Sequence, residues 1–252
     1  MQAVSAISVS RFQNLSYDEF RRRAVDPTLS PAEKIGFPDA YRAGRSESIL
    51  ADIEQKLPAL GSIHRRILDI GPGCGELARS LMERCQDRQH ELVLIDSAEM
   101  LDQIPDQTNI IKRAGRFPEA IEGLDGAPYH AILCYSVIQY VFTEGNLFAF
   151  VDRCLSLLAD GGRLLIGDVP NASMRKRFLS SPNGIRHHQH FMQTEAPPVV
   201  EHLAIEPGQI DDGVLIGLLQ RCRGFGFHAW LLPQDASLPM ANRREDLLIE
   251  KP

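Results

Sequence analysis

The sequence predicts an α/β fold in which a doubly wound, mostly parallel β-sheet carries helices on both faces. Between residues 62 and 167, short apolar runs alternate with amphipathic stretches in strand–helix order. This alternation implies parallel strands joined by right-handed crossovers. The apolar runs are continuous, which is typical of strands covered on both faces. With a length of 252 residues, the chain can form one large α/β domain with a lid.

The predicted elements follow one another regularly. Buried strands are predicted over residues 65–71, 91–97, 109–114, 129–136 and 163–169. Apolar residues at helical spacing predict helices over residues 76–85, 98–104, 147–158 and 214–227, and a helix that opens at 137–141. Residues 159–162, Ala-Asp-Gly-Gly, are predicted to end the helix 147–158. The closing runs 228–234 and 246–252 are joined by a loop with Pro and Asn, and they predict a hairpin-like pair of strands.

Two regions fall outside this alternation. Residues 1–60 predict a helical segment with a helix over 46–57, and residues 171–212 form a polar, histidine-rich insertion that contains proline. Open α/β sheets bind ligands at the carboxyl ends of their strands, so both regions are candidate lids over that edge. The predicted organisation is therefore an N-terminal lid over 1–60 and a ligand-binding domain over 61–252.

Composition narrows the class of protein. The chain is 44% hydrophobic and 24% charged, as in an ordinary globular protein, and its formal net charge of -6 argues against a nucleic-acid partner. Five scattered cysteines without a CxxC pair argue against a disulfide scaffold or a zinc site and suit a reducing cytoplasm. No apolar run suggests a signal peptide or reaches the roughly 20 residues of a spanning helix, so we expect no membrane association.

A glycine-rich turn carries the strongest functional signal. Gly71-Pro72-Gly73-Cys74-Gly75-Glu76 follows a strand and opens a helix, where glycines allow close approach of a ligand and free N–H groups face it. A dinucleotide site favours G-x-G-x-x-G, whereas Glu76 stands here at the third glycine position and would repel a pyrophosphate. An amino acid beside a sulfonium cation is compatible with that carboxylate, which favours S-adenosylmethionine over NAD. The alternative is an ordinary tight strand–helix turn.

Asp96 ends the second predicted strand, about 20 residues beyond the glycine turn. At that distance an acidic residue can accept hydrogen bonds from both hydroxyls of a ribose. The glycine turn and Asp96 therefore predict one nucleoside-binding edge.

Residues 45–170 and the closing strands resemble the class I S-adenosylmethionine-dependent methyltransferase family. The motif LDIGPGCGEL over 68–77 is similar to the family's first motif, and LIDSAEML over 94–101 is similar to its acidic ribose-binding motif. The resemblance implies a seven-stranded sheet that ends in an antiparallel hairpin, with S-adenosylmethionine as cofactor. The implied cofactor-binding residues are Asp69, Gly71, Pro72, Gly73, Gly75, Asp96, Ser97, Met100, Gly115, Arg116, Phe117, Cys134, Tyr135, Ser136 and Tyr140.

One feature departs from the family pattern. Many members have an acidic residue after the third strand that accepts from the adenine amino group, and residues 112–118 contain no acid. Backbone atoms near Gly115 and Arg116 are the predicted replacement. Three further segments, 33–44, 167–178 and 238–252, are similar to methyltransferases of bacterial surface-polysaccharide gene clusters.

Several side chains outside the cofactor motifs are candidates for chemistry. His187, His188 and His190 titrate near neutrality and are candidate bases, although a solvated polar loop or a metal chelate would use the same residues. We predict no metal site. Asp168 is a second candidate base or substrate ligand, with capping of the following helix as the alternative.

The flanking segments add further candidates. Tyr41 and Arg42 are placed to close over the cofactor and pair with its carboxylate. The basic run 175–177 is a candidate site for a phosphate, with a solvated helix face as the alternative. Tyr135 and Tyr140 are expected beside the methyl group.

The predicted function is methyl transfer to a small molecule. O-methylation of a sugar, a nucleotide-linked or another phosphorylated metabolite in bacterial surface-polysaccharide biosynthesis is favoured, because a hydroxyl acceptor needs a base and a phosphate needs cations. The alternatives are N-methylation of a small metabolite, an NAD-dependent oxidoreductase or epimerase, and a non-catalytic binding subunit. Methylation of nucleic acid is disfavoured, because residues 134–140, CYSVIQY, lack an Asn/Asp-Pro-Pro-aromatic motif.

Overall fold

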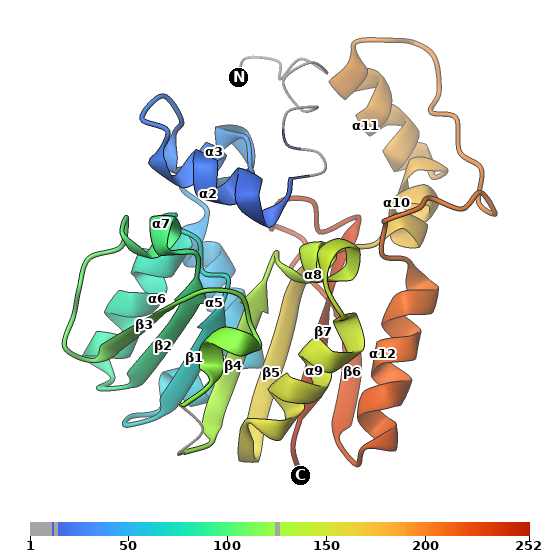
Figure 1. Ribbon diagram of the computed structural model, residues 1–252. Helices are drawn as coiled ribbons and strands as arrows, with labels where there is room; N and C mark the ends of the chain where they lie inside the picture. Colours follow the sequence, from blue (N-terminus) through green and yellow to red (C-terminus); the bar gives the residue numbers. More distant parts are fainter. Residues whose placement is uncertain (1–11, 13–14, 124–126) are drawn as a thin grey trace.

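A seven-stranded mixed sheet forms the centre of the molecule in a computed structural model that describes residue 12, residues 15–123 and residues 127–252 (Figure 1). Its strand order is β3-β2-β1-β4-β5-β7-β6. The strands span Arg66–Ile70 (β1), Glu91–Asp96 (β2), Ile110–Ala114 (β3), Tyr129–Tyr135 (β4), Leu158–Pro170 (β5), His228–Pro233 (β6) and Arg244–Glu250 (β7). The strands β1 to β5 run parallel and β7 is antiparallel to both β5 and β6, which confirms the predicted fold and its closing hairpin.

Helices cover both faces of the sheet. Neighbouring residues of each strand point to opposite sides, so each strand contributes apolar side chains to both layers. Leu68 and Val93 pack in one apolar cluster with α9 and α12, whereas Ile67 and Leu92 pack in a second cluster with α5 and α6. Figure 1 shows these two layers on either side of the strands. The helices are α5 (Ser46–Lys56), α6 (Glu76–Asp87), α7 (Ala98–Leu101), α8 (Ile138–Glu144), α9 (Leu147–Ser156) and α12 (Asp212–Gly224), with short 3-10 turns η1 (Pro58–Gly61) and η2 (Glu119–Ile121).

The N-terminal segment divides into two parts. The helices α2 (Tyr17–Val25), α3 (Pro31–Lys34) and α4 (Asp39–Arg42) lie over the carboxyl ends of β1 and β2 (Figure 1). Ser16 caps α2 and Ser30 forms a capping box with α3, so local sequence defines where these helices begin. We call α2–α4 the lid. The helix α5, which the predicted boundary at residue 60 places in the N-terminal segment, packs its buried apolar residues in the core cluster of the sheet.

The predicted insertion after β5 folds into a helical arm of α10 (Ala172–Leu179) and α11 (Pro182–Met192). Asn171, whose side chain accepts from the Met174 N–H, caps α10, so capping by Asp168 is excluded. The strand β5 also begins earlier than predicted. Residues 159–162 lie inside it, where its register with β4 shifts between Tyr129 and Ala131. No helix in the described part of the chain is long and apolar enough to cross a membrane.

Candidate active site

A cavity of about 670 Å³ lies between the lid and the carboxyl ends of the strands. Cavities of this size accommodate a cofactor or a drug-sized ligand. Most residues that the sequence marks as cofactor-binding line it, namely Arg42, Gly71, Pro72, Gly73, Gly75, Asp96, Met100, Gly115, Arg116, Phe117, Tyr135, Ser136 and Tyr140. The structure therefore brings residues from the lid, the glycine turn and four strand ends to one hollow.

The glycine turn between β1 and α6 forms one wall of the cavity. Gly71 and Gly73 have φ values of +74° and +63°, a region that side chains disfavour. A Cβ atom at Gly71 would lie 2.5 Å from Cγ2 of Val137, and one at Gly73 would lie 2.6 Å from Cγ2 of Ile35. Only glycine fits both positions, and Ile35 places the lid directly against the turn.

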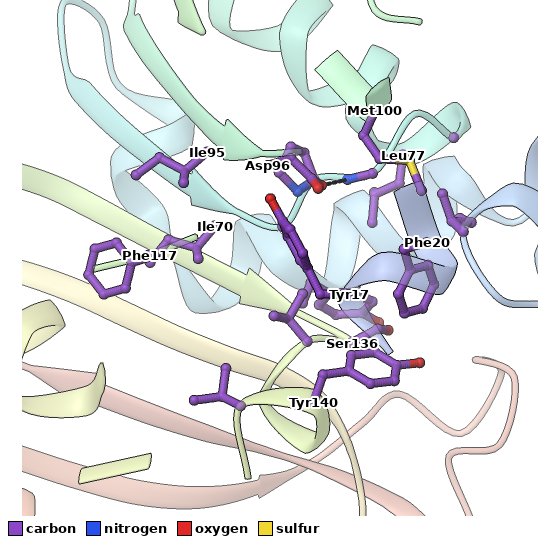
Figure 2. Close-up of a pocket in the computed structure, with 18 of the residues that line it drawn as sticks. Tyr17, Phe20, Ile70, Leu77, Ile95, Asp96, Met100, Phe117, Ser136 and Tyr140 are labelled. Carbon is purple, nitrogen blue, oxygen red and sulfur yellow. Dashed lines mark hydrogen bonds between the residues drawn. The ribbon is translucent and has the colours of Figure 1, made fainter. Parts of the chain in front are cut away.

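Asp96 presents a half-buried carboxylate at the end of β2 (Figure 2). Its oxygens accept from the Gly73 N–H at 2.9 Å and from the Ser97 N–H at 2.7 Å. No cation of the described residues pairs with it, and burial raises its pKa to about 6 against those two hydrogen bonds. A carboxylate held only by backbone donors keeps free lone pairs, which fits the acceptance of ribose hydroxyls.

The cavity continues past the end of β3. Gly115, Arg116 and Phe117 line this part, as does Glu119 on η2, which the sequence analysis missed. Glu119 directly follows the acid-free stretch 112–118. Because Glu119 is an exposed carboxylate without an ion pair in the described residues, it is open to a donor on a ligand.

Tyr17 is a second residue that the sequence analysis missed. Figure 2 shows its side chain reaching from α2 into the cavity, with the hydroxyl pointing toward Asp96. Its backbone N–H donates to the Glu144 carboxylate at 3.2 Å, and the Arg116 guanidinium lies 4.4 Å from its ring centroid. The Phe20 ring meets Tyr140 edge-on at 4.9 Å. No local pattern in the sequence pairs residues of the lid with residues more than 100 positions away.

Asp168 lies at the end of β5, 2% exposed, beside the cavity rather than in its lining. Arg42 and Arg244 donate to one carboxylate oxygen at 2.6 Å and 2.9 Å, and the Ser136 hydroxyl donates to the same oxygen. Burial opposes ionisation, yet Arg244 and Arg42 outweigh it and hold the pKa of Asp168 below its usual range. A carboxylate with a lowered pKa is a weak proton acceptor.

Four of the predicted cofactor residues do not line the cavity. Cys134 faces the core, where burial raises the pKa of its thiol, and Ser97 is buried as the cap of α7. Burial and the charge of Asp96 raise the pKa of Asp69 to about 8. Tyr41 lies on α4 beside Arg42 but outside the lining. All four adjoin a lining residue in the sequence, since Tyr41, Asp69 and Cys134 precede Arg42, Ile70 and Tyr135, and Ser97 follows Asp96.

The three candidate histidines lie on α11 and none lines the cavity. The ring of His187 packs between Phe178 at 5.6 Å and Phe191 at 6.2 Å. The alternative of a solvated polar loop is wrong in its local structure, because these residues are helical. No group of three potential metal ligands occurs in the described part of the chain.

The basic residues 175–177 on α10 all contact other groups of the protein. Arg175 pairs with Glu206, and Arg177 pairs with Asp212. Lys176 donates to the carbonyl of Ala204 at 2.5 Å. These contacts and the absence of the run from the cavity lining argue against a phosphate site there.

Comparison with known proteins assigns a family. A family model described as a methyltransferase domain matches residues 17–197. Over 107 residues, 42% of the chain, the sequence is 33% identical to a probable non-canonical nonribosomal peptide synthetase, CymA, from Salinispora arenicola strain CNS-205. The match spans 1% of the length of that protein.

Several solved structures share the fold. The plantazolicin methyltransferase BpumL, in complex with a triazolic desmethylPZN analog and SAH, is 12% identical with a TM-score of 0.59, over 93% of this chain and 98% of its own. The N-methyltransferase NodS from Bradyrhizobium japonicum WM9, in complex with S-adenosyl-L-homocysteine, is 13% identical with a TM-score of 0.58, over 94% and 98%. The CurJ carbon methyltransferase is 14% identical with a TM-score of 0.54, over 92% and 64%.

Proposed function

This chain belongs to the methyltransferase domain family and is an S-adenosylmethionine-dependent methyltransferase, and we propose that its methyl acceptor is a small molecule bound beneath the lid. The observation that carries the proposal is the single continuous cavity of about 670 Å³, which reaches from Asp96 to the lid residues Phe37 and Arg42. A cavity of that extent has room for a second ligand beside a nucleoside.

The residues present fit the cofactor. The glycine turn suits the amino-acid end, because Gly71 and Gly73 leave no Cβ atoms in the way. Asp96 retains free lone pairs for the ribose hydroxyls. When bound, S-adenosylmethionine supplies a methyl group already activated by its sulfonium. The task of the protein is therefore to align an acceptor with that carbon and to exclude water.

The adenine end has two sources of acceptors. Glu119 offers a free carboxylate, and the backbone at Gly115 and Arg116 lines the same part of the cavity. Either replaces the acidic residue that the stretch 112–118 lacks. We propose that Glu119 accepts from the adenine amino group, so Glu119→Gln, which retains one acceptor oxygen, is expected to bind cofactor more tightly than Glu119→Ala.

The charge of the cavity supports an amine as the acceptor. Its lining contains more carboxylates than guanidinium groups, with Asp39, Glu76, Asp96, Glu119 and Glu144 against Arg42 and Arg116. No histidine or lysine of the described residues lines it. In transfer to an amine, the positive charge passes to the acceptor nitrogen, and a negative field stabilises that charge. A neutral amine also attacks without a general base, which a hydroxyl acceptor requires.

O-methylation of a sugar, favoured from the sequence, is the second candidate. The three segments that resemble surface-polysaccharide methyltransferases contain Arg42, Asp168 and Arg244, and both arginines donate to the Asp168 carboxylate. That convergence supports a sugar-like acceptor. The histidines and the basic run that supported a base and a phosphate lie elsewhere.

The proposal is tested in two steps. Calorimetric titration is expected to show micromolar binding of S-adenosylmethionine and S-adenosylhomocysteine and no binding of NAD. Methyl-labelled S-adenosylmethionine is then incubated with amino sugars, amino acids, peptide amines, neutral sugars and sugar phosphates. Label in amine-bearing compounds supports the first candidate, and label only in hydroxyl compounds favours the second. NAD binding without S-adenosylmethionine binding would overturn the assignment.

A further inference from the structure

The Asp168 carboxylate accepts hydrogen bonds from four side chains that come from distant parts of the chain. Arg42 from the lid, Arg244 from β7 and Ser136 from the end of β4 all donate to its Oδ2 atom. Gln234, which follows β6, donates to Oδ1 at 3.3 Å. One buried carboxylate therefore connects the lid with three strands of the sheet.

The backbone at this point is held in a sparsely populated conformation. Asp168 has a φ of +56° and Ser136, on the neighbouring strand, has a φ of +61°. The Asp168 N–H donates to the Asp246 carboxylate at 2.8 Å, and the Ser136 N–H donates to the Gly167 carbonyl at 2.9 Å. Non-glycine residues persist in the left-handed region only where their surroundings fix them, and such residues cluster at functional sites.

Arg42 is the member of this network that reaches the ligand. It lines the cavity together with the glycine turn and Ser136, whereas Asp168 does not. Its Nη2 atom donates to Ser136 Oγ at 2.7 Å as well as to Asp168. Its guanidinium lies 4.0 Å from the centroid of the Phe37 ring, which packs against it. The position of this cation is thus set by Asp168 before any ligand binds.

We infer that Asp168 is a positioning residue, which holds Arg42 in the cavity wall to bind the carboxylate of the cofactor's amino-acid end and does not accept the proton of the methyl acceptor. The inference rests on the proposed function, because it requires S-adenosylmethionine in this cavity. Because Arg42 belongs to α4, the same pair also fixes the lid against the sheet. A planar guanidinium held at one edge remains able to donate from its other N–H groups.

Two ligands test whether this network serves the amino-acid end of the cofactor, without any need for the methyl acceptor. S-adenosylhomocysteine has the amino-acid end, whereas 5′-methylthioadenosine shares its adenosine and sulfur and lacks that end. For the full chain, Asp168→Asn is expected to weaken S-adenosylhomocysteine about tenfold, as for a lost interaction with a charged group. The affinity for 5′-methylthioadenosine is expected to change less than about twofold. Arg42→Lys is expected to show the same pattern, because lysine lacks the planar fork.

A matched control removes an ion pair elsewhere. Asp152 on α9 pairs with Arg221 at 2.6 Å and neither residue lines the cavity, so Asp152→Asn is expected to alter neither affinity. Thermal unfolding of each variant shows whether it folds. If Asp168→Asn does not fold, Arg42→Lys carries the same expectation alone.

The other outcomes overturn the inference in distinguishable ways. Unchanged affinity for both ligands in Asp168→Asn and Arg42→Lys would show that the network does not serve the amino-acid end. An equal loss for both ligands would show a general structural role. If the unaltered protein bound neither ligand, the proposed function itself would fail, and the inference would fail with it.

Discussion

At the carboxyl edge of the sheet, the pKa values of two carboxylates, Asp96 and Asp168, are shifted in opposite directions. Asp96 ends β2 and accepts only from two backbone N–H groups, so burial raises its pKa to about 6. Asp168 ends β5 and is paired with Arg42 and Arg244, which hold its pKa below its usual range despite burial. Both residues are acidic side chains at strand ends, and their sequence positions alone do not distinguish them.

The two carboxylates differ in how many hydrogen bonds they can still accept from a ligand. A carboxylate that faces a cavity without a cation still has lone pairs for a ligand. A carboxylate that already holds two guanidinium groups and a hydroxyl is committed to the protein. We therefore propose that Asp96 binds the ligand directly and that Asp168 acts on ligands only through Arg42. The predictions below test this contrast.

The largest expected effect is a loss of folding stability when Asp168 is replaced. Asp168→Ala leaves the buried Arg42 and Arg244 without their carboxylate, and removing one partner of a buried pair costs about 3–5 kcal/mol. Urea unfolding of the ligand-free protein measures this loss. Asp152→Ala, which breaks a half-exposed ion pair, is expected to cost much less. Equal losses in the two variants would show that the Asp168 ion pairs stabilise the fold no more than a half-exposed pair does.

The next largest effect is a loss of cofactor affinity when Asp96 is replaced. Asp96→Ala removes a carboxylate acceptor for two ribose hydroxyls, and charge-assisted hydrogen bonds contribute about 1.5–3 kcal/mol each. Affinity for S-adenosylmethionine is expected to fall about 100-fold or more in calorimetric titration. Asp96→Asn, which retains one acceptor oxygen, is expected to lose less. A variant that binds as tightly as the unaltered protein would exclude Asp96 from the cofactor site.

A third prediction uses the raised pKa of Asp96, which is about 6. Only the ionised carboxylate accepts from both ribose hydroxyls, so protonation of the ligand-free protein competes with binding as pH falls through 6. Affinity for S-adenosylmethionine is expected to be about tenfold lower at pH 5 than at pH 7. Titrations at several pH values check this, and Asp96→Asn is expected to flatten the profile between these values.

The smallest effect is expected from the histidines of the helical arm. His187, His188 and His190 lie on α11 outside the cavity, so replacing all three by alanine is expected to change cofactor affinity and turnover less than about twofold. Turnover of the labelled acceptor is the relevant measurement. Loss of turnover with cofactor binding intact would restore these residues as candidate bases.

Local sequence was enough to predict the fold and to propose the glycine turn and Asp96, which line the cavity, as cofactor-binding residues. Continuous apolar strands that alternate with amphipathic helices leave few topologies, and the structure confirms the parallel order and the closing hairpin. The glycine turn could be found because its residues are contiguous and their conformation demands glycine. Asp96 followed from its place at the end of the next strand. Glu119 directly follows the acid-free stretch 112–118, so it is also within reach of the sequence pattern.

Only the tertiary structure decided where the remaining candidate residues lie and what they contact. Arg42, Ser136, Asp168 and Arg244 come from four elements up to about 200 residues apart, and no periodicity predicts that they meet. The same holds for Tyr17, which reaches Asp96 from the lid. Histidines that look catalytic as a cluster lie on a helix away from the cavity. Contacts within a strand–turn–helix unit are set by neighbouring residues, whereas contacts between distant elements depend on how the whole chain packs.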